Sequence, residues 1–321
     1  MKKIAILTSG GDSAGMNAAI ITITKLARKD KYEVYYVRGG YIGLYRDDII
    51  EANKFNSQDY VNNGGSFIWS ARFPDFPNPK NYTKALENLK KRKINKLIVI
   101  GGDGSYQGAL RLSKHGSIIC GCLPGTIDND VVSTKYSIGF DSALNVAVKA
   151  IKQLRCSMKS HDMCTVVELM GRRCSDLAIY AGIATHANVI ITHENKLPIA
   201  SILLAVKKAK ENGERGIVVV LTEYIYNAYD LAKQIQKETG ISTRACILGH
   251  TQRGASPSAM ETFRATLMAW TLYEELKTTT RSFVVGWNNN QPAIINIKKA
   301  LSMKNKDWTK LVDEYNEWRN L

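Results

Sequence analysis

The feature that most constrains the fold of this chain is an alternation between short apolar runs and longer segments with helical spacing. Apolar runs rich in β-branched residues recur at 4–7, 34–37, 97–100, 118–122, 165–169, 189–191, 217–221 and 246–248. Segments with helical spacing lie between most of them, at 16–27, 106–113, 142–154, 199–210 and 228–237. This alternation predicts an α/β fold with parallel sheets, and the continuously apolar runs predict strands covered on both faces.

Length and composition bound the class of protein. A chain of 321 residues with 45% hydrophobic content fits two domains or one large α/β unit. No apolar run approaches the ~18 residues of a membrane-spanning helix, so we expect a soluble protein. The six cysteines form no C-x-x-C pair and no secretory signal precedes them, which indicates neither a zinc site nor a disulfide framework. We therefore expect reduced thiols and a cytoplasmic location.

The charge balance favours anionic partners without identifying one. Lys and Arg number 44 against 29 Asp and Glu, a formal net charge of +15. Nucleic acid and phosphorylated metabolites both fit that charge. The densest basic run, Lys90 to Lys93, closes a helix that we expect to begin near Pro79, and cations stabilise a helix C-terminus. We interpret this run as a solvated helix end rather than a nucleic-acid surface.

The first glycine-rich turn, GGDSAG at residues 10–15, allows two interpretations. It fits the G-x-S-x-G pattern of a hydrolase nucleophile elbow, with Ser13 as the nucleophile. That mechanism needs an oxyanion donor from an earlier strand-loop, whereas Ser13 follows the first predicted strand. A glycine turn between a strand and a helix also exposes backbone N–H groups to a phosphate. We favour phosphate binding at this turn.

A second turn, IGGDGSYQG at residues 100–108, repeats the order of strand, Gly-Gly-Asp and helix start. Two such turns are able to flank one polyphosphate. Neither matches a Walker A loop or a strict G-x-G-x-x-G dinucleotide fingerprint. Each glycine pair alone is also compatible with a simple tight turn, but the repetition with Asp favours phosphate binding.

A third turn, LPGTIDNDV at residues 123–131, follows another predicted strand and places Asp128 and Asp130 two residues apart. Phosphoryl transfer to an alcohol needs a base, and it needs Mg²⁺ and cationic groups to offset charge. Asp128 is a candidate base and Asp103 a candidate Mg²⁺ ligand, although Asp-Asn-Asp is also an ordinary turn composition. Cationic side chains suited to phosphate oxygens adjoin other strand ends, namely Arg72, Arg172, Arg244, His250 and Arg253.

Six motifs together carry a family resemblance: GGDSAGMN, GGSFIWSARF, GGDGSYQG, PGTIDND, ELMGR and LGHTQRGASP, in that order. With them, nearly the whole chain resembles the bacterial-type ATP-dependent 6-phosphofructokinases. The resemblance implies phosphorylation of fructose 6-phosphate at its 1-hydroxyl by ATP, giving fructose 1,6-bisphosphate and ADP in glycolysis. It also implies two Rossmann-like three-layer domains with mainly parallel sheets and the active site in the cleft between them.

The resemblance also implies domain boundaries and an assembly. A larger ATP-binding domain would comprise residues 1–139 and 252–304, and a smaller sugar-phosphate-binding domain would comprise 140–251 and 305–321. The expected assembly is a homotetramer in which a neighbouring subunit completes the sugar-phosphate site through Arg244. Neither nucleic acid nor a membrane is an expected partner.

Residue roles follow from the same resemblance. Asp128 is the expected base, Thr126 and Asp130 position the reacting groups and Mg²⁺, and Asp103 is the metal-linked carboxylate. The expected catalytic set is Asp128, Thr126, Arg172, Gly11 and Arg72. The expected ATP-binding set is Gly11, Tyr41, Arg72, Phe73, Gly102, Asp103, Gly104, Ser105 and Gly108. The expected set for fructose 6-phosphate is Thr126, Asp128, Asp130, Met170, Gly171, Arg172, Glu223, Arg244, His250 and Arg253.

Two glycines bear on the phosphoryl donor, and one methionine bears on the acceptor. Pyrophosphate-using relatives usually carry Asp at the position of Gly104 and Lys at that of Gly125, so glycine at both predicts ATP. Met163 stands where the family usually has a second substrate-binding arginine, and methionine cannot carry charge. We expect a raised KM for fructose 6-phosphate. A different ketose phosphate, or a weakly catalytic partner subunit, remains an alternative.

The family's effector site, which binds ADP or phosphoenolpyruvate between subunits, is usually lined by basic groups and a metal-linked glutamate. The matching positions here carry Ile21, Asn188, Asn212, Glu214 and Gly216, while Lys25, Lys54 and Arg155 keep positive charge. A polyanion meets fewer cations at such a site. We expect weak or absent regulation by either compound.

Overall fold

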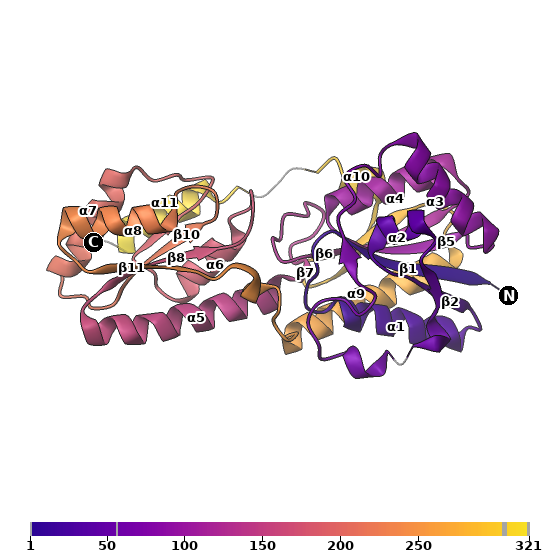
Figure 1. The fold of residues 1–321 in the computed structure, drawn as a ribbon, viewed down its shortest axis with the longest axis horizontal. Coiled ribbons are helices and arrows are strands. Elements are labelled where there is room, and N and C mark those ends of the chain that lie inside the picture. Colours follow the sequence, from indigo (N-terminus) through magenta and orange to yellow (C-terminus); the bar gives the residue numbers. More distant parts are fainter. Residues whose placement is uncertain (1, 56, 304–306, 320–321) are drawn as a thin grey trace. The chain divides into compact units, whose positions relative to one another are not determined.

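The computed structural model describes residues 2–55, 57–303 and 307–319, which form two compact α/β units (Figure 1). One unit comprises Met1–Ser142 and Arg253–Asn305, and the other comprises Ala143–Gln252 and Lys306–Leu321. The chain therefore passes from the first unit into the second, returns to the first, and contributes its last segment to the second. The domain boundary expected between 304 and 305 lies outside the described residues.

The first unit is built on a mainly parallel sheet. Its strand order is β13 (Gln291–Asn296), β12 (Phe283–Asn288), β6 (Ile119–Thr126), β5 (Lys96–Gly101), β1 (Lys3–Ser9), β2 (Glu33–Val37) and β3 (Ile49–Glu51), with the short strands β4 (Ser70–Ala71) beside β1 and β7 (Ile138–Gly139) beside β6. Among the strands of this unit that the structure describes, only β3 and β13 pair antiparallel with their neighbours. The carboxyl ends of β1, β5 and β6 consequently meet at one edge of the sheet.

Helices cover both faces of this sheet (Figure 1). One face carries α1 (Met16–Lys29) and α9 (Ala259–Thr278), and the other carries α2 (Gly40–Arg46), α3 (Pro79–Lys91), α4 (Asp103–His115) and α10 (Ile297–Ala300). Along β1, Ile4 and Ile6 enter the core with α1 and α9, whereas Ala5 and Leu7 enter the core on the opposite face. The prediction from the apolar runs, that the strands are covered on both faces, is confirmed.

The second unit repeats this architecture on a smaller scale. Its strands are all parallel, in the order β11 (Thr243–Ile247), β8 (Cys164–Leu169), β10 (Ile217–Thr222) and β9 (Val189–Ile191). One face packs against α7 (Ile199–Glu211) and α8 (Ala228–Thr239), and the other packs against α5 (Phe140–His161), α6 (Asp176–Ala184) and α11 (Thr309–Arg319). The predicted class, two three-layer α/β units with mainly parallel sheets, is confirmed.

The predicted elements agree with the structure in their cores and differ in their extent. Every predicted strand overlaps an observed one, and the predicted helical segments lie within α1, α4, α5, α7 and α8. The prediction missed α9 and the β12–β13 hairpin. β4 lies outside every predicted strand, and β6 continues through Thr126, so the third turn begins later than predicted. No helix among the described residues is both long and apolar enough to cross a membrane.

Candidate functional site

Three loops converge at the carboxyl edge of the first unit's sheet. Ser9 at the end of β1 lies opposite Gly101 of β5, and Gly101 lies opposite Pro124 of β6. The turns that follow these strands carry the Gly-Gly-Asp motifs and the Asp-Asn-Asp sequence. In open α/β sheets this edge is where ligands bind.

The first turn is not a nucleophile elbow. Ser13 is fully buried, and its hydroxyl donates a hydrogen bond to the carbonyl of Ile138 at 2.7 Å. Its helix, α1, begins only at Met16, after Gly15 in a left-handed conformation. The hydrolase interpretation is therefore wrong. The expected repetition of one arrangement is only partial, because α4 begins directly at Asp103 of its own Gly-Gly-Asp motif.

Gly11 permits a close approach by a guanidinium group. A Cβ added at Gly11 would lie 2.0 Å from Nη1 of Arg253. That Nη1 is 3.4 Å from the carbonyl oxygen of Asp12 and 3.9 Å from its Oδ1. Arg253, from the distant 253–305 segment, thus lies against the first turn. The structure brings Gly11 and Arg253 together, for a steric reason that the motif alone did not reveal.

The second turn presents an open helix N-terminus. No side chain caps the start of α4, where Gly102 is the N-cap residue. A Cβ built at Gly102 or at Gly104 would meet no atom within 4 Å. The first N–H groups of a helix have no intrahelical partner and carry the positive end of the helix dipole. This open turn therefore has the geometry of an anion-binding site.

Three of the residues expected to bind ATP support α4 from behind. The Ser105 hydroxyl donates to the Ser9 carbonyl at 3.1 Å, and the Tyr41 hydroxyl donates to the Ser105 carbonyl at 2.6 Å. Tyr41 is only 3% exposed, and burial raises its pKa, so it acts as a neutral donor. A Cβ at Gly108 would lie 2.7 Å from the Tyr41 ring. The side chains of Tyr41 and Ser105 thus fix the start of α4 rather than face solvent.

Arg72 reaches the same edge through β4. Thr8 and Ser9 of β1 pair with Ser70 and Ala71, and the Gly10 N–H donates to the Ala71 carbonyl at 3.1 Å. Arg72 follows directly and is exposed. Phe73 packs against Tyr45 and Phe76, with ring centroids 5.7 and 6.0 Å away.

The third loop holds a buried carboxylate. Asp128 is 3% exposed, and its backbone N–H donates to Thr126 Oγ1 at 3.1 Å. Asn129 has φ 55°, and its Oδ1 accepts from the Ser137 N–H at 2.9 Å. The Ser137 hydroxyl donates to the Thr126 carbonyl at 2.7 Å. Asn129 and Ser137 are supports that the prediction missed; an Asn between two Asp residues was the available signal, because Asn tolerates the left-handed conformation.

The second and third turns each bring a carboxylate to this edge, Asp103 at the start of α4 and Asp130 after β6. Burial, and then repulsion by Asp130, raises the pKa of Asp103 to about 6. A cation between them would relieve that repulsion, and oxygen ligands are those that Mg²⁺ prefers. No group of three or more His, Cys, Asp or Glu side chains suited to a metal occurs in the described parts of the chain. The residues present fit a Mg²⁺ that takes its remaining oxygens from water and phosphate.

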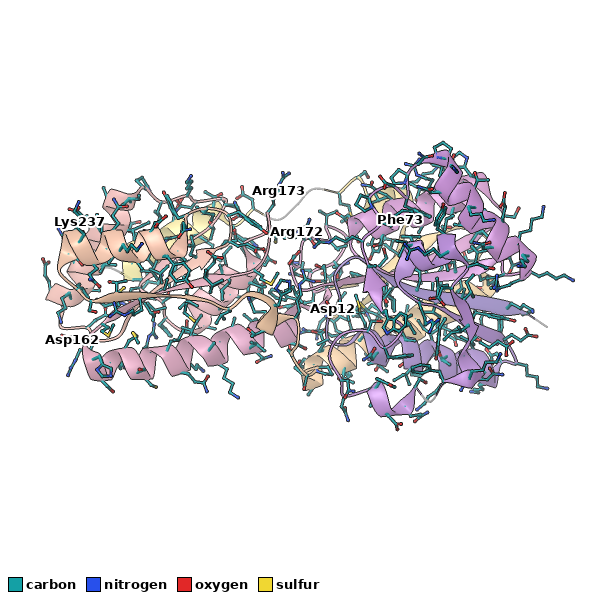
Figure 2. The ribbon with its side chains drawn as sticks, in the orientation of Figure 1. Asp12, Phe73, Asp162, Arg172, Arg173 and Lys237 are labelled. Atoms are coloured by element: carbon teal, nitrogen blue, oxygen red, sulfur yellow. The ribbon has the colours of Figure 1, made fainter. Side chains whose placement is uncertain are left out.

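In the second unit, the turn after β8 carries three of the predicted sugar-phosphate residues, Met170, Gly171 and Arg172, and it contacts a fourth, Glu223. The N–H groups of Gly171 and Arg172 both donate to Glu223 Oε1, at 3.1 and 2.7 Å. Gly171 has φ 146°, and a Cβ there would lie 2.3 Å from the Cys174 carbonyl oxygen. His250 follows β11, at the same edge of this unit's sheet as Glu223. Arg172 is exposed (Figure 2).

Arg244 lies elsewhere in the second unit. It is near the amino end of β11 and pairs with Thr165, whereas Met163 immediately precedes β8. From Thr165 to Leu169 the strand rises about 13 Å, at ~3.3 Å per residue. Within this unit, therefore, the structure does not bring Arg244 or position 163 to the Arg172 turn.

Glu214 stands at one of the positions where this sequence differs from the family's effector site. Its side chain is hydrogen-bonded within its own unit. Its carboxylate accepts from Arg319 of α11 through two bonds of 2.7 and 2.6 Å, and from Asn188 at 3.0 Å. The hydrogen bond with Arg319 is the main cause of the lowered pKa of Glu214. Arg155 donates to the His186 carbonyl at 2.9 Å. Both residues are therefore used in holding the second unit together.

Comparisons with known proteins agree with this architecture. The family model described as Phosphofructokinase matches residues 3–276. The chain is 44% identical to the ATP-dependent 6-phosphofructokinase of Spiroplasma citri, over 99% of this chain and 98% of that protein. It is 41% identical to the enzyme of the same name from Haemophilus influenzae strain PittEE, over 97% of this chain and 98% of that one.

Solved structures show the same fold. Phosphofructokinase from Pichia pastoris in the T-state superposes with a TM-score of 0.88 at 29% identity, and the match spans 99% of this chain but 37% of that longer one. The pyrophosphate-dependent phosphofructokinase from Marinobacter aquaeolei gives a TM-score of 0.86 at 21% identity, over 99% of this chain and 91% of that one. Because the family model matches most of this chain, and a relative is 44% identical over 99% of it, this chain belongs to the phosphofructokinase family.

Proposed function

We propose that this chain is an ATP-dependent 6-phosphofructokinase. It transfers the γ-phosphoryl group of ATP to the 1-hydroxyl of fructose 6-phosphate, giving fructose 1,6-bisphosphate and ADP in glycolysis, and acts in the cytoplasm. The observation that carries the proposal is the meeting of an open helix N-terminus, a buried carboxylate and a carboxylate pair on adjacent strand ends. Full-length relatives named for this activity support it. They favour it over another ketose phosphate and over a weakly catalytic partner subunit.

Phosphate binding falls to the second turn. The start of α4 has no side-chain cap, and the space beside Gly102 and Gly104 is open, so a phosphate there would be stabilised by the helix dipole. Arg72, exposed at the same sheet edge, supplies paired donors for the transferred group as charge accumulates on it. Gly11 adds a backbone contact, and Phe73 lies beside Arg72.

Proton transfer falls to Asp128. A carboxylate in this loop takes the proton from the attacking 1-hydroxyl, and its low exposure keeps water away from the reacting oxygen. Thr126 accepts the Asp128 N–H and so fixes the turn that carries the base. Asn129 and Ser137 secure the loop on its other side.

Mg²⁺ would be held by Asp103, with Asp130 nearby. When bound, it would offset negative charge on the phosphates. The raised pKa of Asp103, caused by burial and then by repulsion from Asp130, supports this assignment.

The donor assignment rests on Gly104 more than on Gly125. Open space at Gly104 leaves room for a nucleotide beyond the phosphates, which a larger side chain would fill. At Gly125, by contrast, an added Cβ would meet Met16 and Ile100 of this chain at 2.8 and 2.9 Å. Glycine at 125 therefore serves the packing of the core, and glycine at 104 is the better evidence for ATP.

Within the second unit, the residues that would bind fructose 6-phosphate are Met170, Gly171, Arg172, Glu223 and His250. Arg244 lies at the opposite edge of the second unit's sheet, which supports its expected role in a neighbouring subunit's site. Exposed apolar side chains on α9, namely Met260, Phe263 and Trp270, support an assembly that covers them. We propose a homotetramer, and light scattering should give four times the 35.7 kDa chain mass.

Regulation by ADP or phosphoenolpyruvate should be weak or absent. The Glu214 carboxylate is already held by Arg319 and Asn188, which supports that expectation. Titration of the rate with each compound tests it.

The activity is tested with purified protein, Mg²⁺ and a panel of sugar phosphates, with ATP or pyrophosphate as donor. Product is followed by coupling to aldolase and NADH oxidation, and by ADP release. We expect fructose 6-phosphate and ATP to give the highest kcat/KM. Faster turnover of another ketose phosphate, or with pyrophosphate, would overturn the assignment.

A further inference from the structure

We infer that His193 is a positioning residue that holds Arg172 in its sugar-phosphate-binding geometry. The inference rests on the proposed function, in which Arg172 contacts fructose 6-phosphate. His193 lies in the loop after β9 and was not among the residues singled out from the sequence. Its Nε2 is 2.6 Å from the carbonyl oxygen of Arg172.

Arg172 occupies a backbone conformation that needs outside support. Its φ is 56°, in the left-handed region that side chains other than Gly, Asn and Asp rarely adopt. Such conformations persist where surrounding contacts over-determine them, and they cluster at functional sites. The question is which contacts hold this one.

Side chains from two other turns hold the two backbone polar groups of Arg172. Its N–H donates to Glu223 Oε1 at 2.7 Å, from the turn after β10, and its carbonyl accepts from His193. The sheet order is β11, β8, β10 and β9, so Glu223 follows the strand next to β8 and His193 follows the strand after that. Glu223 and His193 therefore hold the backbone of Arg172 and not its guanidinium group. We call this pair of contacts the clamp.

The position of His193 is itself fixed. Its backbone N–H donates to the hydroxyl of Ser175 at 3.0 Å, and Ser175 is fully buried at the start of α6. A carbonyl accepts only, so Nε2 of His193 must carry the proton, in the neutral ring as well as in the imidazolium.

The clamp matters because the Arg172 side chain is exposed (Figure 2). An exposed guanidinium has no packing to aim it, so its direction depends on the backbone that carries it. Functional groups keep productive geometry when a supporting shell locks them. Glu223 and His193 supply that shell, with His193 as the member that does not itself touch substrate.

The test compares two substitutions of similar size. His193→Phe keeps a planar ring but has no donor, whereas His193→Gln places an amide N–H near the position of Nε2. His193 is exposed, so both variants should fold with wild-type melting temperatures. We expect His193→Phe to raise the KM for fructose 6-phosphate about two- to tenfold, as loss of one hydrogen bond implies, with the KM for ATP unchanged. His193→Gln should stay near wild type.

A double-mutant cycle separates positioning from a general structural role. If His193 acts through Arg172, His193→Phe should have no further effect on kcat/KM in an Arg172→Ala background. Equal losses in both backgrounds, or wild-type kinetics in His193→Phe, would overturn the inference.

Amide hydrogen exchange tests the clamp without catalysis, so failure of the proposed function is distinguishable from failure of the inference. In His193→Phe, the backbone amides of Gly171 and Arg172 should exchange faster than in wild type, and in His193→Gln they should not. A wild-type protein that lacks fructose 6-phosphate turnover would contradict the function alone. Unchanged exchange in His193→Phe would contradict the clamp.

Discussion

At the scale of single residues, glycines that look alike in the sequence do different work. Gly11 makes space for the Arg253 guanidinium, and Gly108 makes space for the Tyr41 ring. A Cβ at Gly104, by contrast, would meet no atom of this chain within 4 Å. The family resemblance predicted all three as site residues. It could not separate them, because each reason depends on an atom from a distant segment.

Gly104 gives a prediction that separates ligand binding from folding. Alanine at this position meets no protein atom and favours the helix, so the free energy of unfolding should be unchanged or rise by up to about 1 kcal/mol. The added methyl would crowd the phosphate site, so the KM for ATP should rise about ten- to a hundredfold, as overpacking implies. Steady-state kinetics and urea unfolding measure the two effects.

Gln107, exposed on the same helix, provides the control. Gln107→Ala should leave the KM for ATP at its wild-type value. If Gly104→Ala also leaves it there, ATP does not occupy this turn.

At the scale of elements, strands with continuous apolar runs were predictable and elements defined by pairing were not. β4 is two residues long and exists through its pairing with β1, which no local pattern announces. The missed helix α9 did carry a signal, since its buried residues Glu261, Ala265, Met268, Leu272 and Leu276 have helical spacing. The first of those positions is a glutamate, and this charged residue interrupts the apolar pattern that would have predicted the helix.

Glu261 predicts a pH dependence of stability. Its Oε2 accepts from the N–H and hydroxyl of Ser142, both at 3.2 Å, and burial raises its pKa from 4.5 to about 7. A carboxyl whose pKa is raised on folding contributes stability below its unfolded pKa, and this contribution is lost as the pH rises toward 7. At ~1.36 kcal/mol per pKa unit, the loss is about 3 kcal/mol.

The Glu261→Gln variant resembles the protonated carboxyl at every pH. Its free energy of unfolding should be close to that of wild type at pH 5 and exceed it by up to about 3 kcal/mol at pH 8. Urea titrations at both pH values measure this, with Glu274→Gln, exposed on the same helix, as the control. A difference that does not grow with pH would show that Glu261 is charged in the folded protein.

At the scale of the whole molecule, the second unit presents predicted substrate residues at both edges of its sheet. The sequence predicted a strand beginning at Cys246, but β11 begins at Thr243, so Arg244 lies inside its amino end. Position 163 lies at that same edge, before β8. This separation could not be predicted without the strand boundaries. It is the structural basis for expecting that both positions serve a neighbouring subunit.

Met163→Arg should therefore restore a contact across the assembly. A charge-assisted hydrogen bond to phosphate contributes about 1.5–3 kcal/mol, so the KM for fructose 6-phosphate should fall about ten- to a hundredfold. Met163→Leu, which adds no donor, should leave it unchanged. An equal KM in all three proteins would mean that position 163 does not face the substrate.

The central claim is that Asp128 is the base for phosphoryl transfer from ATP to fructose 6-phosphate. The most direct test compares kcat of wild type and Asp128→Asn with saturating ATP, Mg²⁺ and fructose 6-phosphate. General-base catalysis contributes roughly 10²–10⁴-fold, so we predict a fall of several hundredfold or more, with fructose 1,6-bisphosphate formed by wild type in step with ADP. A variant that keeps its kcat within a few-fold of wild type would contradict the account.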